Sequence, residues 1–520
     1  MSHWIIVPIL APALLAAFIV IAARHQIALA RVFSVAGTLA LTGVALALTA
    51  YAATGAVEVY ELGNWPAPFG IVLVLDRLSA LMVLLTAVLA LAVLLYAIGA
   101  GWDRRGWHFH ALFQFQLMGI CGAFLTGDLF NLFVFFEVLL IASYGLMIHA
   151  GGARRMRAGV QYVVYNLLGS TLFLFALGTL YGVTGTLNMA DMALRVAEMS
   201  AGDTALLRVG AILLLLVFSV KAALLPLHFW LPETYAEAPA PVAALFAVMT
   251  KVGAYAILRV YTLVFPPELE ATAGIAGPWL LGAALVTLVV GMIGILGARG
   301  LGRLAAFAAI GSMGTLLVAL ALFTPEAAVA ALYYTLHSTL AGALLFLVVD
   351  MVRERRGRLG DALTAGPAMP QRGLVAALWF GAAIATAGMP PLSGFVGKLL
   401  ILDAAWPSSQ AALIWAAILA TSLVAILGMA QAGSAVFWKT APAAPPPAPE
   451  ADEDPILPPA PSGPPTALPA AACIGLLALI VGLTVLAGPI TGYLEATVAQ
   501  LFAPDAYIET VLGGASEGDT

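Results

Sequence analysis

The chain has 520 residues, of which 62% are hydrophobic and 9% are charged, and its mean hydropathy is +1.02. A soluble globular domain carries about 25% charged residues, so this composition excludes that class and indicates a polytopic membrane protein. The net charge of -5 without a basic stripe argues against nucleic-acid binding. Cys121 and Cys473 are isolated in apolar runs, which argues against a disulfide, a metal ligand or an intrinsic redox centre.

Apolar runs predict an all-α membrane protein with about fourteen transmembrane helices, most of them near the ~20 residues needed to span a bilayer. The first run lacks the basic start and small-residue cleavage site of a signal peptide, so it is expected to be a membrane helix. Residues 53–74 alternate in polarity and contain Gly and Pro, which predicts a small β-hairpin. The runs cover residues 2–23, 30–52, 75–100, 109–126, 128–149, 158–182, 205–231, 239–265, 273–297, 302–323, 326–352, 372–405, 410–438 and 466–489.

The C-terminal part changes in composition. Residues 441–465 are rich in Pro and acidic residues, which predicts an extended linker. The tail after 490 is weakly amphipathic and ends in GGASEGDT, which is expected to be disordered. The predicted organisation is three helices with an outer hairpin (1–108), two five-helix units (109–265 and 273–440), the linker (441–465), and a last helix with an external tail (466–520).

Basic residues indicate how the chain lies in the membrane. Fifteen of the twenty-two Lys and Arg residues fall in alternate connections. By the positive-inside rule these connections are cytoplasmic, so an even number of helices places both termini outside. The fifteen are Arg24, Arg31, Arg104, Arg105, Arg154, Arg155, Arg157, Arg299, Arg303, Arg353, Arg355, Arg356, Arg358, Arg372 and Lys439.

Three of the four lysines, Lys221, Lys251 and Lys398, lie inside apolar runs. Lys221 is 12 residues beyond Val209, about 18 Å along a helix, so its side chain cannot easily reach the headgroups. A lysine at such depth needs an internal partner or a wet cavity. Because lysine, unlike arginine, can give up its proton when it is desolvated, the three are predicted to transfer protons.

Two more ionisable groups lie near the middle of apolar runs. Glu137 is nine or ten residues from each end of its run, and His337 follows Glu326 by eleven residues. The alternatives are a neutral structural glutamic acid and a hydrogen-bonded core histidine. Their depth, similar to that of the lysines, favours one connected set of proton-transfer groups over two independent structural residues.

Prolines predict breaks beside two of the lysines. Pro226 follows Lys221 by five residues, and Pro390 and Pro391 precede Lys398. Each proline removes a backbone donor and should interrupt its helix. The two interrupted helices are the seventh and the twelfth, so they cross the membrane in opposite directions. This spacing predicts an inverted repeat of five helices, helices 4–8 and 9–13, with ion sites at the interruptions.

Several stretches carry a resemblance to a known family: ELGNWPAPFGIVLVLD, LTGDLFNLFVFFEVLLIASY, GTLNMADMA, FSVKAALLPLHFWLPETY, MTKVGAYAILR and GMPPLSGFVGKLLIL. They resemble the antiporter-like subunits shared by respiratory complex I and Mrp-type multi-subunit sodium/proton antiporters, above all the D-type subunits of Mrp antiporters. The resemblance covers residues 1–440. It implies a fourteen-helix fold and a central polar chain in which Glu137 pairs with Lys221, followed by Lys251, His337 and the terminal Lys398.

One departure from the family pattern concerns the helix of His337. Family members often have a second histidine and a lysine further along this helix, where this chain has Ser338 and Gly342. Proton relay through this helix is therefore expected to depend on Ser338 or on water.

Three functions remain open. The favoured one is a bacterial inner-membrane subunit that exchanges sodium ions for protons together with partner subunits and without a cofactor. The alternatives are a proton-pumping subunit of complex I or of a membrane-bound hydrogenase, and a structural scaffold. No run contains a cluster of oxygen ligands, so the residues do not indicate where sodium or another metal ion binds.

Glu137 and Lys221 are predicted to face each other, because a buried charge without a partner costs several kcal/mol. In this interpretation the carboxylate holds Lys221 protonated, and weakening the pair releases the proton toward Lys251. The pair would then be a switch for proton transfer rather than a structural brace.

Overall fold

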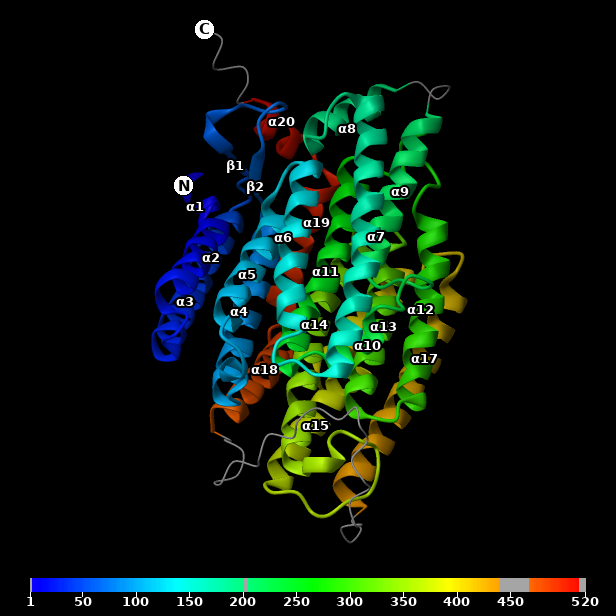
Figure 1. The fold of residues 1–520 in the computed structure, drawn as a ribbon. Coiled ribbons are helices and arrows are strands. Elements are labelled where there is room, and N and C mark those ends of the chain that lie inside the picture. Colours follow the sequence, from blue (N-terminus) through cyan, green and yellow to red (C-terminus); the bar gives the residue numbers. More distant parts are fainter. Residues whose placement is uncertain (1, 200–203, 440–466, 514–520) are drawn as a thin grey trace.

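The computed structural model describes residues 2–199, 204–439 and 467–513, and almost all of its secondary structure is helical (Figure 1). Within these residues, ten helices are long and apolar enough to cross a membrane, and shorter apolar helices accompany them. A polytopic membrane protein, as the composition predicted, is therefore confirmed. The helices are α1 (Ser2–Ile5), α2 (Val7–Phe18), η1 (Ile19–Ala23), α3 (Ile27–Ala52), η2 (Leu62–Asn64), α4 (Arg77–Gly99), η3 (Trp102–Arg105), α5 (Phe109–Leu125), α6 (Leu129–Met147), α7 (Ala153–Thr184), α8 (Met189–Glu198), α9 (Ala205–Lys221), α10 (Leu231–Glu237), α11 (Ala240–Leu263), α12 (Gly277–Gly297), α13 (Leu301–Leu320), α14 (Pro325–Arg356), η5 (Gly357–Leu359), α15 (Arg372–Ala387), α16 (Ser393–Ala405), α17 (Ala411–Gly433), η6 (Ser434–Trp438), α18 (Ala467–Val485), α19 (Ala487–Phe502) and α20 (Asp505–Gly513).

The predicted hairpin is present between α3 and α4. Strands β1 (Glu58–Glu61) and β2 (Val72–Leu75) pair antiparallel, with Glu58 opposite Leu75 and Glu61 opposite Val72. All of β2 is buried, whereas β1 is half-buried. The buried strand leads into α4 through Asp76, so the hairpin ties the start of this helix to the bundle.

One helix, α8, was not predicted from hydropathy because it is too short to cross a membrane. Asn188 begins it, with its side-chain oxygen accepting from the backbone N–H groups of Ala190 at 3.0 Å and Asp191 at 3.2 Å. Met192 and Val196 are buried one turn apart. The helix is therefore held by its cap and by one apolar face.

The last predicted helix, 466–489, corresponds to α18, which ends at Val485, and two helices that were not predicted follow it. After Leu486 the chain continues as α19 and then as α20. Leu494, Val498 and Leu501 are buried at helical spacing, and α19 packs on α14. The predicted linker 441–465 and the residues after Gly513 lie outside the described residues.

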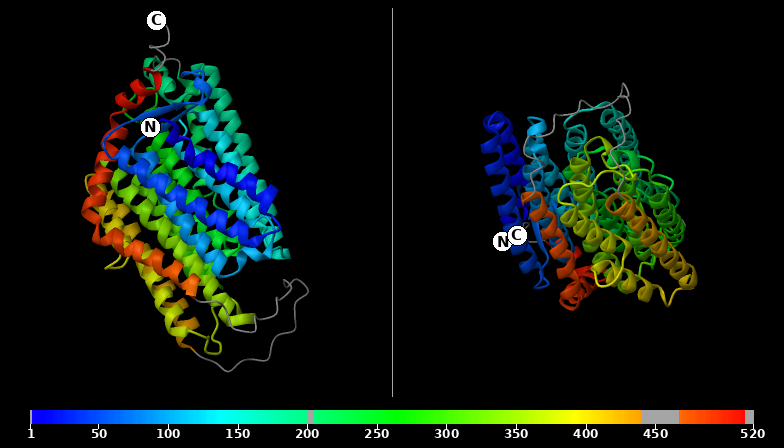
Figure 2. Two further views of the ribbon diagram at one scale, coloured as in Figure 1. Left: turned by 90° about the vertical axis from the view of Figure 1, so that its left-hand side faces the viewer. Right: turned by 90° about the horizontal axis from the view of Figure 1, so that it is seen from below.

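The centre of the bundle is formed by α11 and α14, which pack on each other, and every residue of α11 is buried. The strand pair, α8 and α20 lie at one end, and α15 lies at the other (Figure 1). A further view shows α2 and α3 running side by side along one flank (Figure 2). The ionisable residues of α11 and α14 therefore lie deep inside the protein.

Candidate functional site

Lys221 is the last residue of α9, where the helix is interrupted as predicted. The chain from Ala222 to Trp230 leaves the helical path, and Pro226 lies within this stretch. The Lys221 Nζ donates to Asn166 Oδ1 of α7 at 3.0 Å and lies 5.7 Å from the centre of the Phe136 ring. Lys221 is 6% exposed, so the break places a lysine amine inside the bundle with an amide as its hydrogen-bond partner.

Glu137 lies on α6 and is half-buried. Its Oε1 accepts from the Ser170 hydroxyl of α7. Because Ser170 and Asn166 are four residues apart, both project from one face of α7. The direct contact predicted between Glu137 and Lys221 is not formed here: no ion pair within 4.0 Å joins them, and each binds α7 instead. The fully buried Asn166 amide and the Ser170 hydroxyl offer neutral partners that compete with a salt bridge.

Lys251 lies in the middle of α11 and is 3% exposed. Its Nζ contacts the Met313 Sδ of α13 at 3.3 Å, a weak acceptor. Lys251 also lines a cavity of about 20 Å³ together with Ser312, His337 and Ser338. A space of that size holds about one water molecule, which could join the lysine to the polar groups of α14.

His337 lies in α14 and connects this helix to the second interruption. Its Nδ1 is 2.8 Å from the Ser393 Oγ, at the first residue of α16. A side chain at the next residue, Gly394, would place its Cβ 2.8 Å from the His337 Nε2. The glycine therefore allows the imidazole to lie directly against the start of α16. Ser338, the residue expected to assist relay, lines the same cavity as His337.

Lys398 lies on α16, just over one turn beyond Ser393, and is 5% exposed. Its Nζ donates to the Ala387 carbonyl and to the Ser422 Oγ, each at 2.8 Å. The Ala387 carbonyl is available because α15 ends there, before Pro390 and Pro391. The second predicted interruption, at the end of α15, thus supplies a carbonyl acceptor for Lys398.

The five groups lie on five different helices, α6, α9, α11, α14 and α16. Within the described part of the chain, the hydrogen-bond acceptors of the three membrane-buried lysines are all neutral: an amide, a thioether, a carbonyl and a hydroxyl. Since an unpaired buried ammonium costs several kcal/mol, these lysines are not held in the charged form by a bound carboxylate. An amine in such surroundings can exchange its proton, which suits a relay better than a structural brace.

Residues 126–424 match the family model described as NADH:quinone oxidoreductase/Mrp antiporter, TM. A relative from Rhizobium meliloti, named as the D-type subunit of a probable K(+)/H(+) antiporter, is 38% identical over 100% of this chain and 99% of its own length. The chain belongs to this antiporter family. A second relative, the D-type subunit of the Na(+)/H(+) antiporter of Bacillus subtilis, is 36% identical over 98% of this chain and 100% of its own length.

The fold of this antiporter family member also matches a solved structure. A chain in the Mrp complex from Dietzia sp. DQ12-45-1b superposes with a TM-score of 0.86 at 28% identity, covering 99% of this chain and 100% of that one. The resemblance inferred from the sequence motifs is therefore confirmed over the whole chain and not only over residues 1–440.

The sequence of this antiporter family member did not predict the neutral hydrogen-bond partners of the five ionisable groups, Glu137, Lys221, Lys251, His337 and Lys398. Asn166 and Ser170 lie in a long helix that hydropathy treats as a simple crossing. The signal in the sequence was their spacing, because an amide and a hydroxyl four residues apart lie on one face of a helix. The structure shows that both side chains are buried. Ser422 on α17 carried even less signal, because a lone serine is common in membrane helices.

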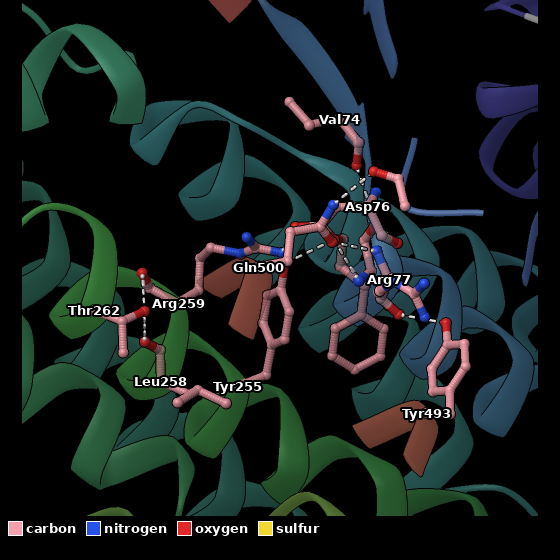
Figure 3. A network of polar contacts seen from close by, with 12 residues as sticks. Val74, Asp76, Arg77, Tyr255, Leu258, Arg259, Thr262, Tyr493 and Gln500 are labelled. Carbon is pink, nitrogen blue, oxygen red and sulfur yellow. Dashed lines mark hydrogen bonds and ion pairs between the residues drawn. The ribbon is translucent and has the colours of Figure 1, made fainter. Parts of the chain in front are cut away.

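A buried ion pair near the hairpin was also missed. The Arg259 guanidinium of α11 lies 2.6 Å from the Asp76 carboxylate, and both residues are buried (Figure 3). Asp76 also caps α4, accepting from the Ser79 N–H at 2.8 Å. The arginine stacks near the rings of Tyr255 and Tyr507, at 5.7 and 5.3 Å. Arg259 lies near the end of α11, but Tyr507 of α20 packs against it and α19 packs on α11.

Proposed function

We propose that this chain is the D-type member of a multi-subunit antiporter that exchanges a monovalent cation for protons across a bacterial inner membrane. Protons would pass along Glu137, Lys221, Lys251, His337 and Lys398. The observation that carries the proposal is the set of five ionisable groups on five different helices, in which the buried lysine amines donate to neutral acceptors of the described residues. Relatives over the full length are named as D-type antiporter subunits, which favours antiport over a redox-driven pump.

Partner subunits are part of this proposal. The relatives are named as subunits, and the matching chain of known structure comes from an Mrp complex. The cation is left as sodium or potassium, since one relative is named for K(+) and another for Na(+). Among the described residues no group of three or more His, Cys, Asp or Glu side chains is placed to hold a metal ion, so we place the cation path at a subunit interface or in a partner.

The membrane arrangement we propose has fourteen crossings, with residues 109–265 and 273–440 as inverted repeats. Support comes from the two interruptions, each beside a lysine: α9 ends at Lys221, and α15 ends eleven residues before Lys398. The arginine-rich connections would be cytoplasmic and both termini outside. Arg154, Arg299 and Arg353, from three of these connections, line one cavity, which fits their lying on the same side.

The decisive experiment measures cation-dependent pH change in everted vesicles that contain the whole complex. Sodium and potassium are tested separately on the complete complex, on the complex lacking this chain, and on the Lys398→Ala complex. We expect exchange only in the complete complex, because the terminal lysine is the last proton carrier of the row. Exchange at full rate without this chain would refute the function, and full-rate exchange with Lys398→Ala would refute the role of that lysine.

A further inference from the structure

A wide cavity opens at the end of the bundle that carries the arginines. It has a volume of about 580 Å³ and lies between the start of α7 and the connection from α12 to α13, with α10 as a third wall. Arg154 and Arg157 line it from α7, and Arg299 lines it from the α12–α13 connection. None of the proton-transfer residues proposed above lines this cavity.

The acidic groups of the cavity are mostly neutralised from within. Glu233 forms an ion pair with Arg303, and Asp361 forms one with Arg353 at 3.0 Å. Burial opposes ionisation of Asp361, but Arg353 and the Gly302 amide outweigh it, so the pKa of this carboxyl is below its usual value. The Asp361 carboxylate is therefore charged at neutral pH, and both carboxylates are already paired with an arginine.

Three guanidinium groups that line the cavity are not used in these ion pairs. Arg154, Arg157 and Arg299 have no hydrogen-bond or ion-pair partner in the part of the chain that the structure describes, and Glu237 is the single lining carboxylate without a side-chain partner there. The cavity thus has an excess of about two positive charges, from segments far apart in sequence. Guanidinium groups that line one cavity suit a phosphate, whose oxygens accept charge-assisted and paired hydrogen bonds from arginine.

The two helices that lead to the cavity arginines, α7 and α12, carry exposed apolar side chains close to them in sequence. Val160, one helical turn after Arg157 on α7, is 62% exposed, and Leu296, near the end of α12, is 44% exposed. Phe229 is also exposed, and its carbonyl accepts from Gln161, which lines the cavity. A free anion would have no use for these side chains, whereas a phospholipid could lay its acyl chains on them.

We propose that this cavity binds the phosphate group of an anionic phospholipid, held by Arg154, Arg157 and Arg299, with the acyl chains along the exposed sides of α7 and α12. Basic pockets between membrane helices on the cytoplasmic side recognise anionic headgroups in this way. The inference is independent of the ion-transport proposal, because it uses no residue of the proton row. The interrupted stretch after Lys221 adjoins the bound lipid through Phe229.

The test uses the purified full complex in detergent, titrated with short-chain phosphatidylglycerol and followed by native mass spectrometry. The Arg154→Gln/Arg299→Gln complex is compared with a matched double variant, Arg358→Gln/Arg372→Gln, whose arginines lie at the same end but do not line the cavity. We expect about a tenfold weaker lipid affinity in the cavity variant and no change in the matched one. Equal affinity in all three complexes would overturn the proposal.

Two further arms identify the ligand. Short-chain phosphatidylcholine should bind more weakly than phosphatidylglycerol to the unaltered complex, and inorganic phosphate should compete only at much higher concentration. If inorganic phosphate bound as tightly as phosphatidylglycerol, the site would serve a free anion and the lipid assignment would fall. Should the glutamine variant fail to assemble, Arg154→Lys/Arg299→Lys keeps the charge but loses paired hydrogen bonds. Its lipid affinity should still fall, and unchanged affinity would count against the site.

Discussion

Lys221 donates to Asn166 at 3.0 Å, and not to the carboxylate of Glu137. Glu137 in turn accepts a hydrogen bond from Ser170, which lies on α7 one turn beyond Asn166. Glu137 and Lys221 are therefore connected indirectly, because α7 supplies a separate hydrogen-bond partner to each of them. Small changes in α7 can strengthen or weaken the coupling between the two, and we propose that this makes Asn166 and Ser170 positioning residues for proton release from Lys221.

Substitution of Asn166 tests that role. Asn166→Ala removes the acceptor of the Lys221 amine, a hydrogen bond that contributes about 0.5–1.5 kcal/mol when the amine is neutral and about 1.5–3 kcal/mol when it is charged. We expect the maximal exchange rate in vesicles to fall about tenfold or more, with a changed pH profile that a purely structural defect would not produce. Thr171→Ala is the matched control, since Thr171 is exposed on the same helix and bonds only the Leu167 carbonyl. An unchanged rate and pH profile in Asn166→Ala would remove Asn166 from the mechanism.

Glu137 and Lys221 are predicted to act as one unit in transport. Glu137→Gln keeps the volume and the hydrogen bond from Ser170 while removing the charge, so exchange should stop although the complex assembles. Lys221→Ala should have the same effect, and the double variant should be no worse than either single variant. The measurements are exchange in vesicles and subunit content after purification. A Glu137→Gln complex that exchanges cations normally would leave Glu137 with a structural role alone.

Replacing Gly394 at the contact between α14 and α16 is predicted to lower stability and the exchange rate. A Cβ there would lie 2.2 Å from the Ala385 carbonyl oxygen and 2.8 Å from the His337 Nε2. Forcing an extra carbon into a packed contact costs about 1–3 kcal/mol, so Gly394→Ala should lower the thermal midpoint of the complex and its exchange rate. Gly282→Ala on α12 has open space around its Cβ and serves as the control. Equal thermal midpoints for the two variants would show that α16 shifts without cost.

The buried Asp76–Arg259 pair is predicted to matter for stability. Arg259→Gln leaves the Asp76 charge without its partner, which costs about 3–5 kcal/mol. Adding Asp76→Asn removes that charge while keeping an acceptor for the α4 cap, so the double variant should regain part of the loss. As a control, Arg195→Gln breaks the i,i+4 Arg195–Asp191 pair, which contributes about 0.5 kcal/mol or less, and the partly exposed hydrogen bond from Arg195 to the Thr184 carbonyl. Similar thermal midpoints for Arg259→Gln and Arg195→Gln would contradict the prediction.

The arginine connections are predicted to be cytoplasmic. Single cysteines are introduced at Arg358 and at Trp65, which is exposed beside the hairpin, after replacement of the buried Cys121 and Cys473. A membrane-impermeant maleimide added to intact cells should label the cysteine at 65 and reach the one at 358 only after permeabilisation. The reverse pattern would invert the proposed topology.

The amino-acid sequence by itself determined that this is a membrane protein, where most of its long apolar helices lie, and which of them carry ionisable groups, but it did not indicate α8, α19 or α20. Hydropathy, proline and charge act within one segment, so they can be evaluated along the chain without knowing its neighbours. The hairpin at 53–74 and the interruptions beside Lys221 and Lys398 were predictable for that reason.

Only the tertiary structure decided which side chains meet. Whether Lys221 contacts Glu137 or Asn166 depends on how α6, α7 and α9 rotate and approach one another, and segment hydropathy contains no information about rotation. The same holds for Arg259, which lies near a helix end in sequence yet is buried because α19 and α20 pack over it. Partner choice follows from the packing of surfaces between helices, and that packing exists only once the bundle has formed.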